Sequence, residues 1–302
     1  MLATGQSGHD LARQIRDGRR TRLRRGVMTA GRDAGSDVDR SVARAAGALV
    51  LVRDAVVSHA AAAAVHGLPT TTHQAVVCVT RPNRSGNRRR PDPARVHLHS
   101  ARLEAADVRR IRGVAVTSPA RTVCDLARAS RGPSALVPAD AALAAGAATP
   151  GALAAVLRAQ QGWPGSRMAG RVLALADPGA ESPLESLVRG VLVLDGGLPV
   201  PLLQHPVRGA DGRMFRVDLC WPEHRTVVEV DGRVKYDNPR SGSAAAALWA
   251  EKRREDSIRE AGWVVVRVVA DDVNNRPGLL VGRVRTALQR AAAEHGRPPP
   301  AW

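Results

Sequence analysis

The chain has 302 residues and a formal net charge of +17, with 45 Lys and Arg against 28 Asp and Glu. This length predicts two domains or three small ones. Hydrophobic residues make up 44%, which excludes a disordered tail. Aromatic residues make up only 2%, which predicts cores of Ala, Val and Leu and argues against base stacking on aromatic side chains. The charge indicates a polyanion partner, most simply nucleic acid; the alternative is a merely basic protein.

The three cysteines, Cys78, Cys124 and Cys220, lie far apart and predict neither a disulfide framework nor a zinc knuckle. The first residues lack the apolar run of a signal peptide. Residues 133–157 have low charge, with Asp140 inside the stretch, but are too weakly apolar to span a bilayer. We therefore expect a cytoplasmic protein without a membrane partner.

The N-terminal residues predict a helix followed by a basic hairpin, as at the end of a winged helix. Leu11 and Ile15 are at helical spacing, Gly18 ends the helix, and a short strand follows around residues 22–24. Residues 29–40 are polar and predict a linker. Seven arginines lie between residues 13 and 25, and four of them are the candidate phosphate contacts: Arg20, Arg22, Arg24 and Arg25.

The middle region predicts a mixed α/β structure. Expected helices are 58–66, 119–129 and Ala-rich segments within 140–175, and expected strands are 75–80, 95–99 and 114–116. A loop at 82–93 is either a phosphate contact or a surface loop, and it carries Arg84, Arg88, Arg89 and Arg90. His97 and His99 share a strand face but lack a third ligand, which favours a structural role over a metal site.

From residue 181 the chain predicts one small α/β domain in the order α-β-β-β-α-β-α. A helix from Ser182 to about residue 194 precedes strands at 200–207, 213–221 and 226–230. A helix at 244–260, a strand at 263–269 and a helix at 279–294 follow. The domain boundaries expected from these patterns are a basic segment with linker at 1–45, the middle region at 46–178, the last domain at 179–296 and a tail at 297–302.

Three carboxylates are expected to share one face of the hairpin at residues 216–232. A turn between Glu223 and His224 places Asp218 opposite Glu229, and Asp231 follows on the same face. The neighbouring valines 217, 228 and 230 should point to the other face. Like charges in opposed positions destabilise a sheet unless something neutralises them, and Mg²⁺ held by two carboxylates does so. The alternative is that the acids are solvated on an exposed strand.

Residues 181–290 resemble the restriction-endonuclease-like, PD-(D/E)XK fold, in particular a branch related to very-short-patch-repair endonucleases. The segments that carry the resemblance are ESPLES, VDLCWPE, VVEVDGRVKY and KRREDSIREAGW. The resemblance implies an α/β/α domain that hydrolyses DNA phosphodiesters with Mg²⁺ (or Mn²⁺) held by Asp218 and Glu229. Glu185 would be a further acid, with a capping box as its alternative role.

The sequence departs from this family at one catalytic position. Asp231 stands where most members carry a lysine that orients the attacking water. Lys235, or Lys252 on the next helix, could supply the missing ammonium. A solvated helix face is the alternative for Lys252, and Glu251–Arg254 and Glu255–Arg259 read as ordinary surface pairs.

The first two regions resemble AbiEi-family antitoxins through DGRRTRLRRGV, SHAAAAAVHGLP and TSPARTVCDLA. This resemblance implies a winged-helix-like N-terminus and a toxin protein as a further partner. The leading hypothesis is therefore a DNA-associated endonuclease. The alternative is a DNA-binding regulator or antitoxin whose nuclease domain is degenerate.

Overall fold

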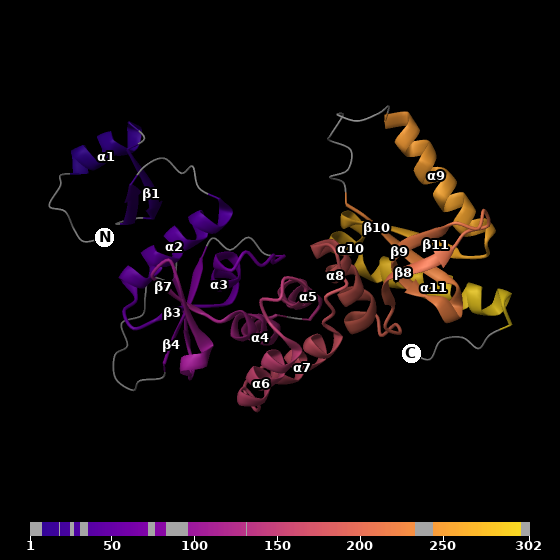
Figure 1. Cartoon of the computed structure of the whole chain (residues 1–302). Coiled ribbons are helices and arrows are strands. Elements are labelled where there is room, and N and C mark those ends of the chain that lie inside the picture. The colour runs from indigo at the N-terminus through magenta and orange to yellow at the C-terminus, as the bar shows by residue number, and fades with distance from the viewer. Residues whose placement is uncertain are drawn as a thin grey trace. The chain divides into compact units, whose positions relative to one another are not determined.

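The computed structural model describes residues 8–17, 19–24, 27–30, 36–71, 76–82, 96–130, 132–232 and 244–296. Its contacts form two compact units (Figure 1). The N-terminal unit comprises Met1–Ala129 and Ala145–Ser166, and the C-terminal unit comprises Ser130–Ala144 and Arg167–Trp302. The structure is thus a mixed α/β protein of more than one part, as expected, although the chain alternates between units in a way the sequence did not indicate.

The N-terminal unit begins with the helix and hairpin predicted from its sequence. Helix α1 (Gly8–Arg16) precedes β1 (Arg20–Arg24) and β2 (Val27–Ala30), which pair antiparallel. The linker expected at 29–40 is wrong from residue 37 onward, because helix α2 (Asp37–Leu51) starts there. A capping box starts this helix: the Asp39 amide donates to Ser36 Oγ at 3.2 Å, and the Ser36 amide donates to the Asp39 carboxylate at 2.9 Å.

A five-stranded mixed sheet in the order β5-β4-β3-β7-β6 forms the centre of this unit. Its strands are β3 (Val56–Val57), β4 (Val77–Arg81), β5 (Val96–Ser100), β6 (Val108–Ile111) and β7 (Val114–Thr117). Its further helices are α3 (His59–Val65), α4 (Pro119–Ala129) and α6 (Pro150–Ala159). The main buried cluster against the sheet consists of valine and alanine, as the shortage of aromatic residues predicts.

From residue 183 onward the C-terminal unit has the predicted order of helices and strands with one short α-helix added, and two further helices come from residues 136–175. Its sheet has the order β11-β10-β9-β8, with β10 and β11 parallel and the other pairs antiparallel. The strands are β8 (Leu202–Arg208), β9 (Met214–Trp221), β10 (Thr226–Asp231) and β11 (Val264–Val269). The helices are α5 (Leu136–Ala144), α7 (Ser166–Leu175), α8 (Pro183–Gly190), α9 (Ala244–Glu260), α10 (Ala270–Asn275) and α11 (Pro277–Glu294).

Two apolar clusters, one on each face of this sheet, give the unit three layers. Leu219, Val228 and Val268 pack with buried residues of α8, α10 and α11. Val227 and Val265 pack on the other face with Ile258 of α9. The carboxylates and the helix that follows them therefore lie on a rigid α/β/α framework.

A buried ion pair explains the single acid in the low-charge stretch and why α5 belongs to the C-terminal unit. Asp140 Oδ2 lies 2.7 Å from Arg189 Nη2 on α8, and both side chains are 1% exposed. The other oxygen, Asp140 Oδ1, accepts the amide hydrogen of Asp177 at 2.9 Å. The contacts thus group α5 with the segment that follows residue 166 instead of with the rest of the middle region.

The three cysteines are unpaired and lie in the interior of the protein. Cys78, Cys124 and Cys220 are buried free thiols, which agrees with the absence of a disulfide framework. Among the described residues, no helix combines the length and apolar character needed to cross a bilayer.

Candidate active site

The predicted register of the β9–β10 hairpin is correct up to the carboxylates. Trp221 pairs with Thr226 and Leu219 with Val228, as the proposed turn requires. The ladder ends there, and Asp218 Oδ2 accepts the amide hydrogen of Val230 at 2.7 Å. The two strands therefore separate beyond the Leu219–Val228 pair, so the expected pairing of Asp218 with Glu229 is not part of the ladder, and the Asp218 carboxylate is the acceptor for the Val230 amide.

The alternation of side chains along β9 breaks at Asp218. Val217 belongs to the cluster on the α9 face, whereas Leu219, two residues later, belongs to the opposite cluster. Regular alternation would place both on one face. The expectation that Val217 points with Val228 and Val230 is therefore wrong, although the latter two do share a face.

Gln204 on β8 is a site residue that the sequence did not reveal. Its Nε2 donates to Glu185 Oε2 at 2.9 Å and lies 3.4 Å from Asp218 Oδ1. Its φ of +49° lies in the left-handed region, which costs about 1–3 kcal/mol for a non-glycine residue and persists only where the surroundings impose it. Such strained residues concentrate at functional sites, so we include Gln204 in the candidate site.

Glu185 reaches the site from the first turn of α8. Ser182 is the N-cap, as predicted, and its Oγ accepts the Glu185 amide hydrogen at 3.1 Å. The Glu185 carboxylate does not complete the capping box on the Ser182 amide; it accepts from the Glu181 amide at 3.0 Å and from Gln204. Glu185 is 7% exposed, while Glu181 pairs with Arg216 at the surface. Glu185 is thus tied to Asp218 through one amide group.

Glu229 is a mostly buried carboxylate paired with Arg254 of α9. Its Oε1 lies 2.8 Å from Arg254 Nη2, and its side chain is 13% exposed. Burial raises the pKa of Glu229 to about 7; Arg254 opposes this increase, and the nearby charge of Asp218 adds to it. Arg254 is therefore the cation that reaches the predicted metal ligand.

The other predicted catalytic residues that the structure describes, Asp231 and Lys252, contact side chains other than Glu229. Asp231 lies 3.8 Å from Arg267, whose guanidinium also binds Glu251 and Glu255 at 2.7 Å each. Lys252 is directed toward Trp249, with its Nζ 5.6 Å from the ring centroid, and not toward Glu229. Lys235 lies outside the described residues.

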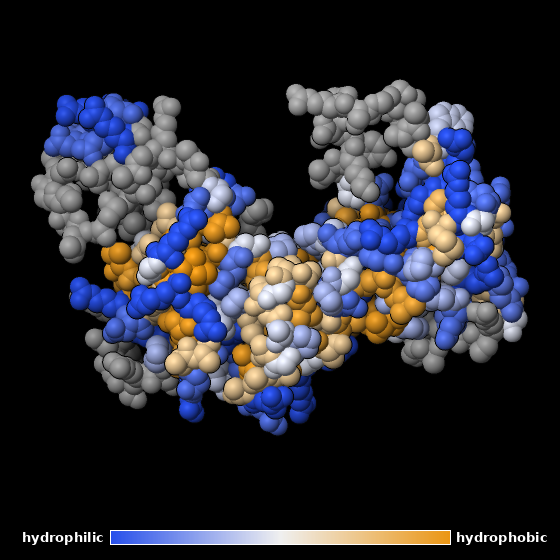
Figure 2. All heavy atoms as spheres, viewed as in Figure 1, coloured by the Kyte–Doolittle hydropathy of each residue, from blue (hydrophilic) through white to orange (hydrophobic). Residues whose placement is uncertain are grey.

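The two helical pairs expected on α9 are present. Glu251 lies 3.4 Å from Arg254, and Glu255 lies 2.8 Å from Arg259. Both acids also bind Arg267 of β11. Figure 2 shows that the outer surface over α9 is mostly hydrophilic. These pairs therefore link α9 to the sheet and are more than isolated surface contacts.

The carboxylates suit a hard cation held by few protein ligands. Val230 and Gln204 donate to the two oxygens of Asp218, Arg254 donates to Glu229, and carboxylate oxygens are hard donors for a metal ion. Mg²⁺ commonly takes one or two carboxylates and completes its shell with water and phosphate. No group of three or more potential ligands for a metal occurs among the described residues. The donor set thus fits a two-carboxylate site only.

The side chains of the predicted phosphate contacts lie outside the described residues. Arg20, Arg22 and Arg24 lie on β1, but their side chains are outside the described residues. Arg25 and the loop arginines, Arg84, Arg88, Arg89 and Arg90, also lie outside them. Their proposed role therefore remains a prediction from charge.

Two proteins of Mycobacterium tuberculosis are similar to most of this chain. Uncharacterized protein Rv2248 of strain H37Rv is 35% identical over 230 residues, which cover 76% of this chain and 80% of the relative. Uncharacterized protein MT2308 of strain CDC 1551 matches with the same identity and coverage. No protein-family model matches the chain.

Proposed function

This chain belongs to the family of the two Mycobacterium tuberculosis proteins, and from the geometry of its own carboxylates we propose that it is a metal-dependent phosphodiesterase that cleaves DNA in the cytoplasm. The observation that carries the proposal is that Asp218 binds the backbone amide next to Glu229 where β9 and β10 separate, while Glu229 is held by Arg254. The α/β/α layers and the strand order of the C-terminal unit support an endonuclease-like fold. The helix and hairpin at the N-terminus support a winged-helix-like DNA-binding segment.

In this proposal Asp218 and Glu229 would hold Mg²⁺ or Mn²⁺ through their carboxylate oxygens. The bound ion would supply an activated water and stabilise the charge that develops on the phosphate. Gln204 positions Asp218 and Glu185 through its amide group. Arg254 balances the charge of Glu229 and is the cation that we propose for substrate phosphate, whereas Lys252 or Lys235 was expected to orient the attacking water.

Hydrolysis of duplex DNA by the full chain tests this function. With Mn²⁺ or Mg²⁺ the unmutated protein should cut the duplex, and EDTA should stop it. Asp218→Asn and Glu229→Gln should each lower the rate by about 100-fold or more. Glu260→Gln is the matched control, because Glu260 is an exposed acid at the end of α9. A rate that survives both site substitutions would refute the assignment, and a parallel RNA substrate identifies the polymer.

A DNA-binding regulator or antitoxin, with a toxin protein as partner, is the second candidate function. Two observations favour it: Arg254 already neutralises Glu229, and Asp231 stands at the position of the usual lysine. A degenerate nuclease domain would then serve as a scaffold. Salt-dependent duplex binding without metal-dependent cleavage would support this candidate against the enzyme.

A further inference from the structure

Three histidines lie in a row in the N-terminal unit, and two of them come from a strand far from the third in sequence. The rings of His59 on α3 and His99 on β5 are stacked, with centroids 3.8 Å apart and an interplanar angle of 16°. The His97 ring lies 4.4 Å from His99. His97 is exposed and His59 is 8% exposed, so the row leads from the surface to the interior.

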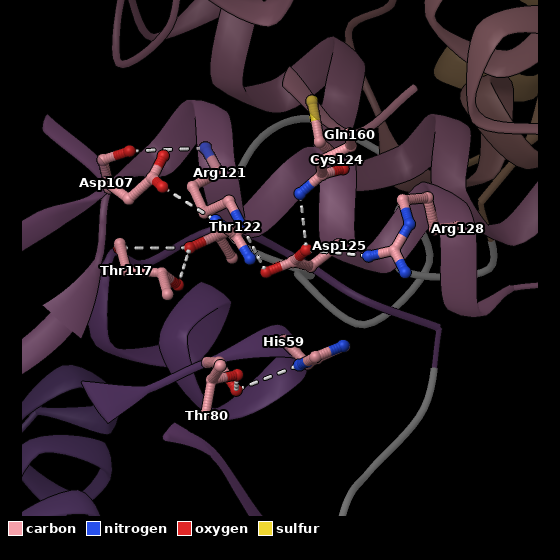
Figure 3. Close-up of polar contacts among 12 residues, drawn as sticks. His59, Thr80, Asp107, Thr117, Arg121, Thr122, Cys124, Asp125, Arg128 and Gln160 are labelled. Carbon is pink, nitrogen blue, oxygen red and sulfur yellow. Dashed lines mark hydrogen bonds and ion pairs between the residues drawn. The ribbon is translucent and has the colours of Figure 1, made fainter. Parts of the chain in front are cut away.

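An arginine–carboxylate network on α4 adjoins this row. Arg121, which is 2% exposed, binds Asp125 at 2.9 Å and Asp107 at 2.7 Å. Asp125 also accepts from Arg128 at 3.2 Å and from Gln160 at 2.8 Å. Figure 3 shows these three donors converging on Asp125 above His59. The carboxylates are thus fully engaged by donors of the protein.

His99 and Arg121 retain polar atoms that the described residues do not satisfy: a guanidinium donor of Arg121 and a ring nitrogen of His99, which is a donor in one tautomer. His99 Nε2 and Arg121 Nη2 are buried and have no partner among the described residues. Ser58 Oγ accepts from Thr80 at 2.8 Å, so its own hydrogen can go to His59 Nδ1 at 3.0 Å. This arrangement leaves the ring hydrogen of His59 on Nε2. Unsatisfied buried polar groups are rare, and three of those among the described residues belong to this network: His99 Nε2, Arg121 Nη2 and the acceptor Gln160 Oε1.

Backbone strain and charge also distinguish this cluster. His59 has a φ of +53°, a left-handed conformation at the first residue of α3, which only an over-determined environment maintains. Burial lowers the pKa of His59 and His99 to about 4 each, and Arg128 adds to this effect at both rings. The rings are therefore neutral at neutral pH; Arg128 and Arg121 disfavour a positive charge on His59, whereas at His99 the Asp125 carboxylate opposes Arg128.

We propose that His59, His99, Arg121 and Arg128 form a binding site for an oxyanion of the phosphate class, with His97 at its entrance. A phosphate accepts hydrogen bonds only from such donors, and guanidinium groups match its geometry. Free phosphate and the terminal phosphate of a nucleotide or nucleic acid share this chemistry. The site lies wholly within the N-terminal unit and does not depend on the proposed nuclease function.

Binding of the anion should be linked to protonation of the histidines. The groups that face them are Arg121, Arg128, Asp125 and His97, and they leave both rings neutral before binding. A bound phosphate raises the pKa of each ring, because it favours the charged imidazolium. The complex therefore takes up protons, and affinity should increase as the pH falls from about 8 to about 6.

Imidazole ¹H–¹⁵N spectra of the full chain test the proposal directly. Inorganic phosphate should shift the His59 and His99 signals in a saturable manner, more tightly at about pH 6 than at about pH 8. Arg128→Gln and His99→Gln should each weaken binding by about tenfold. Arg158→Gln is the control, because Arg158 is an exposed arginine of α6, and it should leave binding unchanged. Dispersed signals of the remaining histidines show that each variant is folded.

The source of the phosphate follows from two further titrations, with an oligonucleotide that carries a 5′-phosphate and with the same oligonucleotide without it. A shift with the phosphorylated strand at concentrations where inorganic phosphate has no effect assigns the site to nucleic-acid ends. Equal saturation by inorganic phosphate assigns it to a small anion. The proposal is overturned if neither probe moves the two signals at about 50 mM phosphate, or if the variants bind as the unmutated chain does.

Discussion

Replacing Arg189 by methionine should destabilise the C-terminal unit strongly. The substitution replaces the guanidinium by the apolar end of a methionine side chain of similar length. Asp140, which is 1% exposed, is then left without its cation. Removing one partner of a buried ion pair costs about 3–5 kcal/mol, because the remaining charge is buried and uncompensated. Arg189 also donates to the Leu175 carbonyl oxygen, and this contact is lost as well. We expect a loss near the upper end of that range.

The double variant Asp140→Leu with Arg189→Met separates the pair from its surroundings. Without either charge, the site becomes an apolar contact, which is often as stable as a buried ion pair. One amide hydrogen, that of Asp177, then lacks its acceptor, a loss of about 1 kcal/mol. The double variant should therefore recover most of the stability that the single variant loses.

Urea unfolding followed by tryptophan fluorescence measures these differences. The control is Arg290→Met, because Arg290 pairs with Glu294 at the surface, and its midpoint should match that of the unmutated chain. In a thermal scan Arg189→Met should lower the transition of the C-terminal unit by about 10 °C. A loss under about 1 kcal/mol for Arg189→Met, or a double variant no better than the single one, would refute the reasoning.

Three further predictions concern pH, the strained strand and the basic hairpin. The pKa of His59 in the folded chain is about 4, below its usual value, so His59 contributes stability above pH 6.5 that is lost as the pH falls through 4. The free energy of unfolding, measured at a series of pH values, should decrease by about 3 kcal/mol over this range, and His59→Gln should make it less dependent on pH. Gln204→Ala should lower metal-dependent hydrolysis about 10- to 100-fold, and an unchanged rate would remove Gln204 from the site. Fluorescence anisotropy measures the affinity of the basic-hairpin variant for duplex DNA at several salt concentrations. The slope of log affinity against log salt concentration should become smaller by roughly one unit for each lost phosphate contact, and an unchanged slope would mean that the DNA binds elsewhere. The variant for this last measurement replaces four arginines by alanine: Arg20, Arg22, Arg24 and Arg25.

The sequence predicted the elements whose ends carry local signals. Ser182 and Pro183 mark the start of α8, and Gly262 follows the end of α9. The turn at residues 222–225 set the β9–β10 register, which three residue pairs confirm. Helix α2 also has a local signal, the capping box at Ser36 and Asp39, but the polar composition before it favoured a linker. Local patterns were thus informative wherever they were not outweighed by composition.

The features that were missed depend on contacts between distant segments. Nothing near Gln204 indicates that its amide lies between Glu185 and Asp218, because these three residues come from different elements. The same holds for Arg254, which the sequence indicated only as a surface partner of Glu251 although its guanidinium reaches Glu229. Asp140 was noticed as an isolated acid, and its partner lies 49 positions further along the chain.

Binding of Mn²⁺ to the full chain tests the central claim most directly. Electron paramagnetic resonance measures the concentration of free Mn²⁺. Its signal should decrease when the chain is mixed with a duplex that carries phosphorothioate linkages, because Mn²⁺ then binds at the site and the phosphate of the duplex completes its ligand shell. The paired substitution of Asp218 by Asn and Glu229 by Gln should abolish that site, and Glu260→Gln should leave it intact. Mn²⁺ binding that persists in the paired variant, or no binding by the unmutated chain with the duplex present, would contradict the metal-dependent phosphodiesterase.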